Sequence, residues 1–125
     1  MRIALLGFSP ESEDDPSEEG GTMVKLAALL KRPDGTTREE FQRWWLEEHT
    51  PLAKRFPRLR KYVVSLSIDG PFEEPAYDGF AELWFDNLDD LEYAFSAPES
   101  APALEDRRNH VKEMVRLVTV EHEIV

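Results

Sequence analysis

The sequence predicts an α+β domain in which helices cover one face of a four-stranded antiparallel sheet. Three observations predict it: four short segments have the apolar pattern of strands, the segments between them repeat apolar residues at helical spacing, and the order is βαββαβ. A chain of 125 residues with 41% hydrophobic residues can bury one core without a disulfide. Because the chain has no cysteine, a thiol nucleophile, a thiolate metal site and a redox pair are excluded.

The first strand is predicted at residues 24–31, where both alternating faces are apolar enough to be buried. A turn follows at residues 33–35. Thr37 with Glu40 has the form of a capping box and predicts a helix over about residues 38–49. Its apolar stripe consists of Phe41, Trp44, Trp45 and, further on, Leu52.

Thr50-Pro51 is predicted to interrupt this helix, because proline lacks the amide donor, although the pair could also start another turn. The second strand is predicted at residues 61–68 and the third at residues 79–86, with a loop over residues 69–78 between them. On the third strand, alternation separates two faces, one with Phe80, Glu82 and Trp84 and the other with Ala81, Leu83 and Phe85.

Asp86 or Asn87 is expected to cap the second helix, which ends before Pro98. Its inward residues are predicted to be Leu88, Leu91 and Phe95, and a further short helix carries Leu104 and Val111. The last strand is predicted over about residues 115–125, with one face formed by Val118, Val120, His122 and Ile124. This order of elements is that of the ferredoxin-like fold.

Residues 1–22 are expected to precede the folded domain of residues 23–125. They hold six acidic residues and one arginine, and residues 9–22 contain no apolar side chain, which is typical of a flexible linker. Residues 2–8 could add an edge strand. The sequence leaves open whether residues 1–22 are a genuine extension or a misassigned start.

The charge balance opposes binding to nucleic acids and anionic membranes. Twenty-six acidic residues against 15 Lys and Arg give a net charge of −11. Nucleic acids and anionic membranes are bound by clustered basic residues, so neither is expected as a partner. No apolar run approaches the roughly 20 residues that span a bilayer. We therefore expect a cytoplasmic protein.

The apolar patterns also predict a homodimer. Helices can cover one face of such a sheet, yet the first and third strands are apolar on both faces. A second copy is the simplest cover for the other face. The alternative is an exposed face that is merely somewhat apolar.

The segment from Met23 to Val63 resembles the opening of EthD-domain proteins, which are named for ethyl tert-butyl ether degradation. Its most specific part is WLEEHTPL at residues 45–52, and residues 77–99 and 120–125 resemble later parts of the family. At residues 109–112, where the family leads us to expect an aromatic residue and an acid, the sequence has His110 and Lys112. That segment is therefore not counted among the candidate site residues.

The resemblance implies a dimeric α+β barrel and a role in oxidative degradation or polyketide pathways. Relatives resemble dehydratases, decarboxylases, lactone isomerases, cofactor-free monooxygenases and haem-binding enzymes. No cofactor is predicted, and haem is left open by the haem-binding relatives.

Three residues are predicted as catalytic. His49 lies beside the apolar stripe near a helix end, and imidazole exchanges protons near neutral pH, but it could also only cap carbonyl groups. His122 is expected to point into an apolar layer, where it needs a partner, either a substrate or a residue such as Glu82. Glu82 itself lies among aromatic residues, where burial favours acid–base work, unless it pairs with an arginine.

A ligand pocket is predicted from aromatic residues, with core packing as the alternative. Its residues are Trp45, Tyr62, Phe80 and Trp84. No metal site is predicted. The sequence thus predicts a protein that binds a small apolar or aromatic metabolite, with proton-transfer or cofactor-free oxidative chemistry of the oxidoreductase, lyase or isomerase type. The alternative is a noncatalytic accessory or ligand-binding dimer that supports an oxidoreductase system.

Overall fold

The computed structural model describes residues 23–125. The expectations for residues 1–22, an edge strand and a flexible linker, lie outside the described residues. Within the described part of the chain, no helix is long and apolar enough to cross a membrane.

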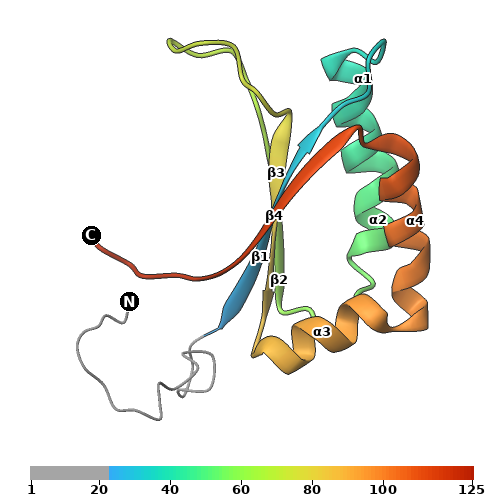
Figure 1. Cartoon of the computed structure of the whole chain (residues 1–125), viewed down its shortest axis with the longest axis vertical. Coiled ribbons are helices and arrows are strands. Elements are labelled where there is room, and N and C mark those ends of the chain that lie inside the picture. Colours follow the sequence, from blue (N-terminus) through green and yellow to red (C-terminus); the bar gives the residue numbers. More distant parts are fainter. Residues whose placement is uncertain (1–22) are drawn as a thin grey trace.

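The sheet has the predicted ferredoxin-like topology (Figure 1). Its strands lie in the order β2-β3-β1-β4 and every neighbouring pair is antiparallel. The bounds are β1 Val24–Lys31, β2 Lys61–Leu66, β3 Gly79–Phe85 and β4 Glu113–Val120. The alternation predicted for β3 is confirmed, since Leu83 pairs with the buried Leu26 of β1 while its neighbours face the other side.

Two strand ends were predicted wrongly. β2 ends at Leu66 rather than residue 68, and Ile68 is largely exposed. β4 ends at Val120 rather than residue 125. Val120 pairs with Val24, the first residue of β1, so no described strand continues beside the end of the chain.

The first helical segment continues through Thr50-Pro51, against the predicted interruption. It consists of α1 Arg38–Arg43, a π-helical turn η3 Trp44–His49, and α2 Thr50–Ala53. The Thr37–Glu40 capping box is confirmed. In η3, the Thr50 amide bonds to the Trp45 carbonyl five residues back. This wider turn accommodates Pro51, whose ring would otherwise clash with the carbonyl four residues before it.

The second helical region comprises α3 Leu88–Ser96, a 3₁₀ turn η4 Pro98–Ser100, and α4 Ala101–His110. Asn87 caps α3 by accepting a hydrogen bond from the Asp90 amide at 2.8 Å. The prediction that Leu88 faces inward is wrong. Leu88 is 37% exposed, and Ala94 is the buried residue of α3.

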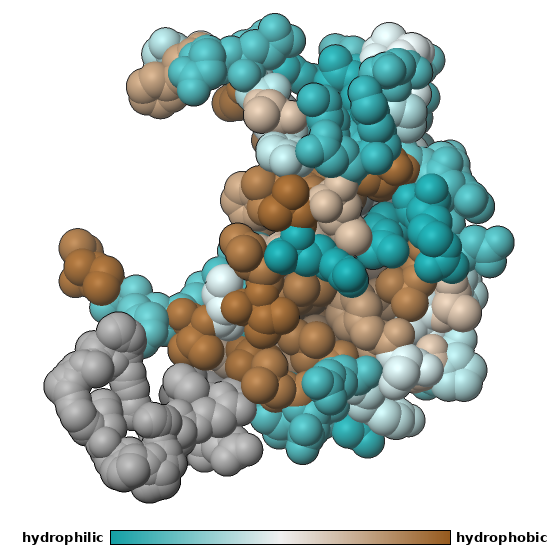
Figure 2. Space-filling view, in the orientation of Figure 1, coloured by the Kyte–Doolittle hydropathy of each residue, from teal (hydrophilic) through white to brown (hydrophobic). Residues whose placement is uncertain are grey.

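All helices lie on one side of the sheet, and the core fills the space between them (Figure 1). We call this side the covered face. Phe41 and Trp45 of the first helical segment pack there against Leu26, Leu83 and Phe85 of the sheet. Figure 2 shows a hydrophobic hollow between the sheet and α3, with hydrophilic side chains across its upper part.

The opposite side, which we call the open face, is covered by no described element (Figure 1). Its apolar members include Phe80, which is 40% exposed, and Leu117, which is 55% exposed. At its centre Lys25 donates hydrogen bonds to Glu82 at 2.9 Å and to Glu121 at 3.1 Å. The charged groups at the centre of the open face are therefore paired with one another.

Candidate functional site

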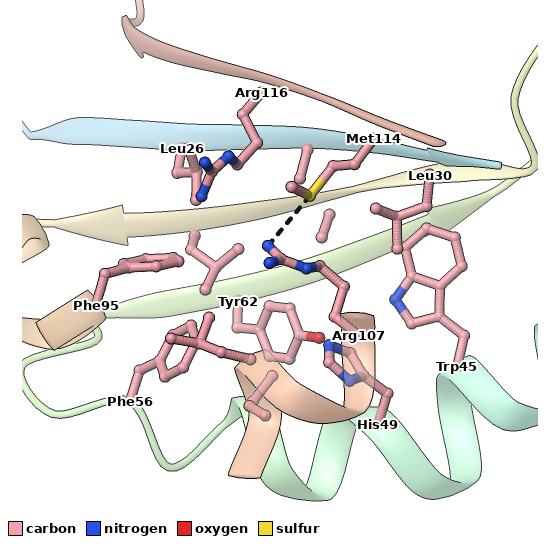
Figure 3. Close-up of a pocket in the computed structure, with 16 residues that line it drawn as sticks. Leu26, Leu30, Trp45, His49, Phe56, Tyr62, Phe95, Arg107, Met114 and Arg116 are labelled. Atoms are coloured by element: carbon pink, nitrogen blue, oxygen red, sulfur yellow. Dashed lines mark hydrogen bonds between the residues drawn. The ribbon is translucent and has the colours of Figure 1, made fainter. Parts of the chain in front are cut away.

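A cavity lies on the covered face between the sheet and the helices (Figure 3). Its volume is about 50 Å³, enough for a few water molecules. A more open groove of about 500 Å³, bordered by α3 and β4, shares Leu26, Phe95 and Arg116 with it. The cavity wall is mostly apolar, and its polar side chains are Trp45, His49, Tyr62, Arg107 and Arg116.

His49, at the end of the π-helical turn, is held by a carboxylate of α4. Its Nδ1 lies 3.0 Å from Oδ2 of Asp106, and the ring packs on Trp44 at 5.0 Å between centroids. Trp44 Nε1 donates to the same carboxylate at 3.2 Å, and Nδ1 of His110 lies 3.2 Å from its other oxygen. The carboxylate therefore fixes the orientation of His49 from outside the cavity.

The protonation state of His49 follows from these surroundings. Burial lowers the pKa of His49 below its usual 6.5, and the hydrogen bond to Asp106 opposes this effect. A carboxylate only accepts hydrogen bonds, so the Nδ1 facing it carries the proton in the neutral ring. Nε2 then has a free lone pair, and no described residue is hydrogen-bonded to it. Imidazole gains and loses a proton near neutral pH, so Nε2 of His49 can act as a proton acceptor near pH 7.

Trp45 and Tyr62 form another part of the wall. Trp45 is 0% exposed, and its Nε1–H finds no well-formed hydrogen bond among the described residues. Burial raises the pKa of Tyr62 to about 12, an effect that the neighbouring Trp45 indole opposes. Gly79 permits this packing, since a Cβ there would meet the Trp45 ring at 3.1 Å and the Ser65 carbonyl at 2.3 Å.

The structure brings together only part of the predicted site. His49, Trp45 and Tyr62 line the cavity. Glu82 lies on the open face with Phe80 and Trp84, where it accepts a hydrogen bond from Lys25 rather than from an arginine. The predicted roles of these open-face residues stay predictions.

His122 was expected in an apolar layer, and this placement is wrong in the single chain. It follows the end of β4 and is exposed. Its catalytic role stays a prediction.

Three cavity or neighbouring residues were missed from the sequence: Asp106, Arg107 and Arg116. Arg116 carried a signal, because it alternates in step with Val118 and Val120 and so places a charge on the covered face. Asp106 and Arg107 carried none, since α4 is polar around most of its circumference. His110, which was not counted among the candidate site residues, stacks on Trp44 at 5.0 Å between ring centroids.

Metal and haem binding find little support on this face. Among residues 23–125, no group of three or more His, Asp or Glu residues is placed to hold a metal ion. A cavity for a few water molecules does not fit a porphyrin with the side chains as they stand.

The fold recurs in solved structures. An ethyl tert-butyl ether degradation (EthD) family protein from Bacillus halodurans is 24% identical with a TM-score of 0.67, the match covering 82% of this chain and 99% of that one. A dimeric protein of unknown function with a ferredoxin-like fold, from Bacteroides fragilis, is 22% identical with a TM-score of 0.62, covering 79% and 96%. SnoaB, a cofactor-independent oxygenase from Streptomyces nogalater, is 10% identical with a TM-score of 0.60, covering 84% and 98%.

The sequence has no match among curated proteins. The EthD domain family, however, matches residues 33–112, a range that contains most of the cavity residues, including His49 and Arg107, and also Asp106 behind His49. The resemblance seen in the sequence is thereby confirmed, and the chain belongs to the EthD domain family.

Proposed function

We propose that this EthD-domain protein binds a small apolar or aromatic metabolite on the covered face and that Nε2 of His49 accepts a proton from it. The observation that carries the proposal is the His49–Asp106 hydrogen bond at the wall of an apolar cavity. An oriented imidazole with a carboxylate behind it is the arrangement that general-base catalysis uses.

The proton-transfer step is the same for several reactions. A C–H or O–H bond of the bound molecule breaks, its proton passes to Nε2, and the electron pair stays on the ligand. The Asp106 carboxylate, 3.0 Å from Nδ1, stabilises the resulting imidazolium. From the anion, an isomerase returns the proton elsewhere, a lyase expels a leaving group, and a cofactor-free oxygenase passes electrons to dioxygen. SnoaB shows that this fold can carry an oxygenase without a cofactor.

The test is hydrogen–deuterium exchange into compounds with acidic C–H bonds, such as 1,3-diketones and anthrone, followed by NMR in D₂O. We expect the wild-type protein to accelerate exchange of a bound compound and His49→Gln to lose about 10²-fold or more of this acceleration. Glu48→Gln, an exposed neighbour on the same turn, is the control and should exchange at the wild-type rate. A His49→Gln protein that exchanges as fast as the wild type would contradict the proposal.

The sequence-based candidates enter the same assay. His122→Ala and Glu82→Gln test whether residues outside the covered face take part in proton transfer. A loss of exchange in these variants that equals the loss in His49→Gln would place the chemistry on the open face instead.

A noncatalytic ligand-binding role is the second candidate, and one observation favours it. The Asp106 carboxylate also bonds to Trp44 and lies near His110, so the same contacts join the first helical segment to α4. Under this reading, compounds bind with equal affinity to wild type and His49→Gln, and no C–H exchange is accelerated. Binding and exchange together therefore distinguish the two candidates.

We also propose that two chains associate through their open faces. Phe80, Val115 and Leu117 leave apolar surface exposed on an uncovered sheet, and this is the kind of surface that a partner buries. The charges at its centre are already paired within the chain, so their burial leaves no unpaired ion. The dimeric relative from Bacteroides fragilis supports this proposal.

A further inference from the structure

Two arginines converge on the cavity. Figure 3 shows Arg107 reaching from α4 toward the sheet and Arg116 reaching from β4 toward the same space. We propose that the ligand of this site is an organic acid whose carboxylate is held by Arg107 and Arg116, with its apolar body against the cavity and the adjoining groove. This inference rests on the proposed ligand-binding function and specifies its ligand class.

Neither guanidinium has a carboxylate partner among the described residues. The single hydrogen bond that the Arg107 guanidinium makes there is to Sδ of Met114 at 3.3 Å. Four other arginines do form ion pairs with aspartates: Arg32, Arg38, Arg58 and Arg60. Three further described arginines without an ion pair, Arg43, Arg55 and Arg108, are exposed to water. Arg116 is exposed as well, although it lines the cavity. Arg107 is therefore the one half-buried arginine left without an acid in residues 23–125.

This arrangement is unfavourable without a ligand. Burial lowers the pKa of Arg107, and the positive charges of Arg116 and Arg108 lower it further. A charge that is partly taken out of water, as in Arg107, needs a counter-charge, and a second positive charge nearby, that of the exposed Arg116, increases that need. Glu92 lines the groove together with Arg116, but no acidic residue in the described part forms an ion pair with either arginine. An anionic ligand supplies the counter-charge that the described residues do not provide.

A third group in the cavity also calls for an acceptor. The Trp45 Nε1–H is fully buried and makes no well-formed hydrogen bond among residues 23–125, although the Tyr62 hydroxyl is near enough for the indole to lower the pKa of Tyr62. Figure 3 shows the indole nitrogen turned toward the interior of the cavity. The two guanidinium groups and the indole can only donate hydrogen bonds. A ligand that matches them must accept several hydrogen bonds at one end, and a planar carboxylate pairs with guanidinium in a two-pronged geometry.

The remaining walls specify the body of the ligand. Leu26, Phe56, Leu83 and Phe95 line the cavity, and Leu91 and Val118 continue the apolar surface into the groove. Arg116 lies where the cavity and the groove meet, because it lines both. A small aromatic or aliphatic acid therefore fits both the charged and the apolar parts.

The test compares acids with their amides, which differ in charge and little in shape. Benzoate against benzamide and hexanoate against hexanamide are titrated into the full-length protein by calorimetry. We expect each acid to bind at least about tenfold more tightly than its amide, as for a hydrogen bond to a charged group. Arg107→Met and Arg116→Met should each abolish this preference. Arg108→Met, which removes the same charge from the next position of α4, should preserve it.

The outcomes separate this inference from the proposed function. Acids and amides that bind equally well would overturn the inference and leave the proposed ligand site intact, whereas no binding by either class would overturn both. An equal loss in Arg108→Met would show a general charge effect and also overturn the inference. The acid–amide comparison in the wild-type protein needs no variant, so it decides the matter even where a substitution prevents folding.

Discussion

The two faces of the sheet differ in whether their charged side chains are paired. On the open face, Lys25 bonds to both Glu82 and Glu121, and the hydrogen bonds to Glu82 and Glu121 raise the pKa of Lys25. On the covered face, Arg107 and Arg116 line an apolar cavity and have no acidic partner among residues 23–125. The central charges of the open face are thus paired within one chain, and the two arginines of the covered face are not.

This difference suggests different occupants for the two faces. A surface whose ions are already paired can be buried by a flat apolar partner without leaving a charge unpaired. A cavity with unpaired donors selects a ligand that carries acceptors. We therefore assign the open face to a second copy of the chain and the covered face to a small molecule.

The largest expected effect compares two phenylalanines of β3 that point to opposite faces. Phe85 is 0% exposed on the covered face, so Phe85→Ala should lower the free energy of unfolding by about 3–5 kcal/mol. Phe80→Ala, on the open face, should cost less than about 1 kcal/mol in the monomer and more where the chain is dimeric. Urea unfolding at low and high protein concentration measures both. If Phe85→Ala and Phe80→Ala lowered the free energy of unfolding equally at low and at high protein concentration, the assignment of faces would be contradicted.

The fold could be predicted because strand alternation and helix caps are local features. The alternation of Phe80, Glu82 and Trp84 against Ala81, Leu83 and Phe85 was enough to separate the faces of β3. The ends of strands were less predictable, because they depend on where the paired strand stops, as β4 stops opposite Val24. Local sequence also does not show that a π-helical turn can carry a helix through Thr50-Pro51.

The next effect concerns assembly. Leu117→Glu places a charge in the middle of the open face and should weaken self-association by about 100-fold, which corresponds to about 2.8 kcal/mol. Leu46→Glu, on the exposed side of the first helical segment, is the matched control, since Leu46 is 49% and Leu117 is 55% exposed. Light scattering across a dilution series measures the change. A wild-type protein that is monomeric at micromolar concentration, or two variants that dissociate alike, would refute dimerisation through the open face.

A smaller effect concerns pH. The folded-state pKa of His49 lies below the usual 6.5. As the pH falls below 6.5, His49 therefore becomes protonated in the unfolded chain before it becomes protonated in the folded chain. The contribution of His49 to stability is therefore complete above about pH 6.5 and declines toward its lowered pKa, by at most about 1.4 kcal/mol per pH unit. His49→Gln should remove this part of the pH dependence.

The contribution of Asp106 to the pKa of His49 can be tested separately. Asp106 raises the pKa of His49 against the effect of burial. Asp106→Asn should therefore lower the pKa of His49 further, which NMR titration of the imidazole protons would show. An unchanged or raised value would mean that the carboxylate does not interact with the ring as the 3.0 Å contact indicates.

Only some residues of the candidate site could be predicted from the sequence. His49, Trp45 and Tyr62 were found because they lie on apolar patterns that point toward the core. Glu82 was grouped with them because alternation separates two faces of a strand without telling which one the helices cover. Asp106 and Arg107 reach His49 and the cavity only through the packing of α4, which joins residues 57 positions apart in the chain.

The central claim, that the covered face and not the open face holds the ligand, is tested most directly by the indole N–H signals of the tryptophans. Trp45 lines the cavity with an unpaired Nε1–H, whereas Trp84 on the open face donates to Glu121 at 3.2 Å. Benzoate and hexanoate are titrated into ¹⁵N-labelled protein, with signals assigned from Trp45→Phe and Trp84→Phe. We predict a saturable shift of the Trp45 signal while the Trp84 signal stays in place. A saturable shift of Trp84 alone would contradict this account.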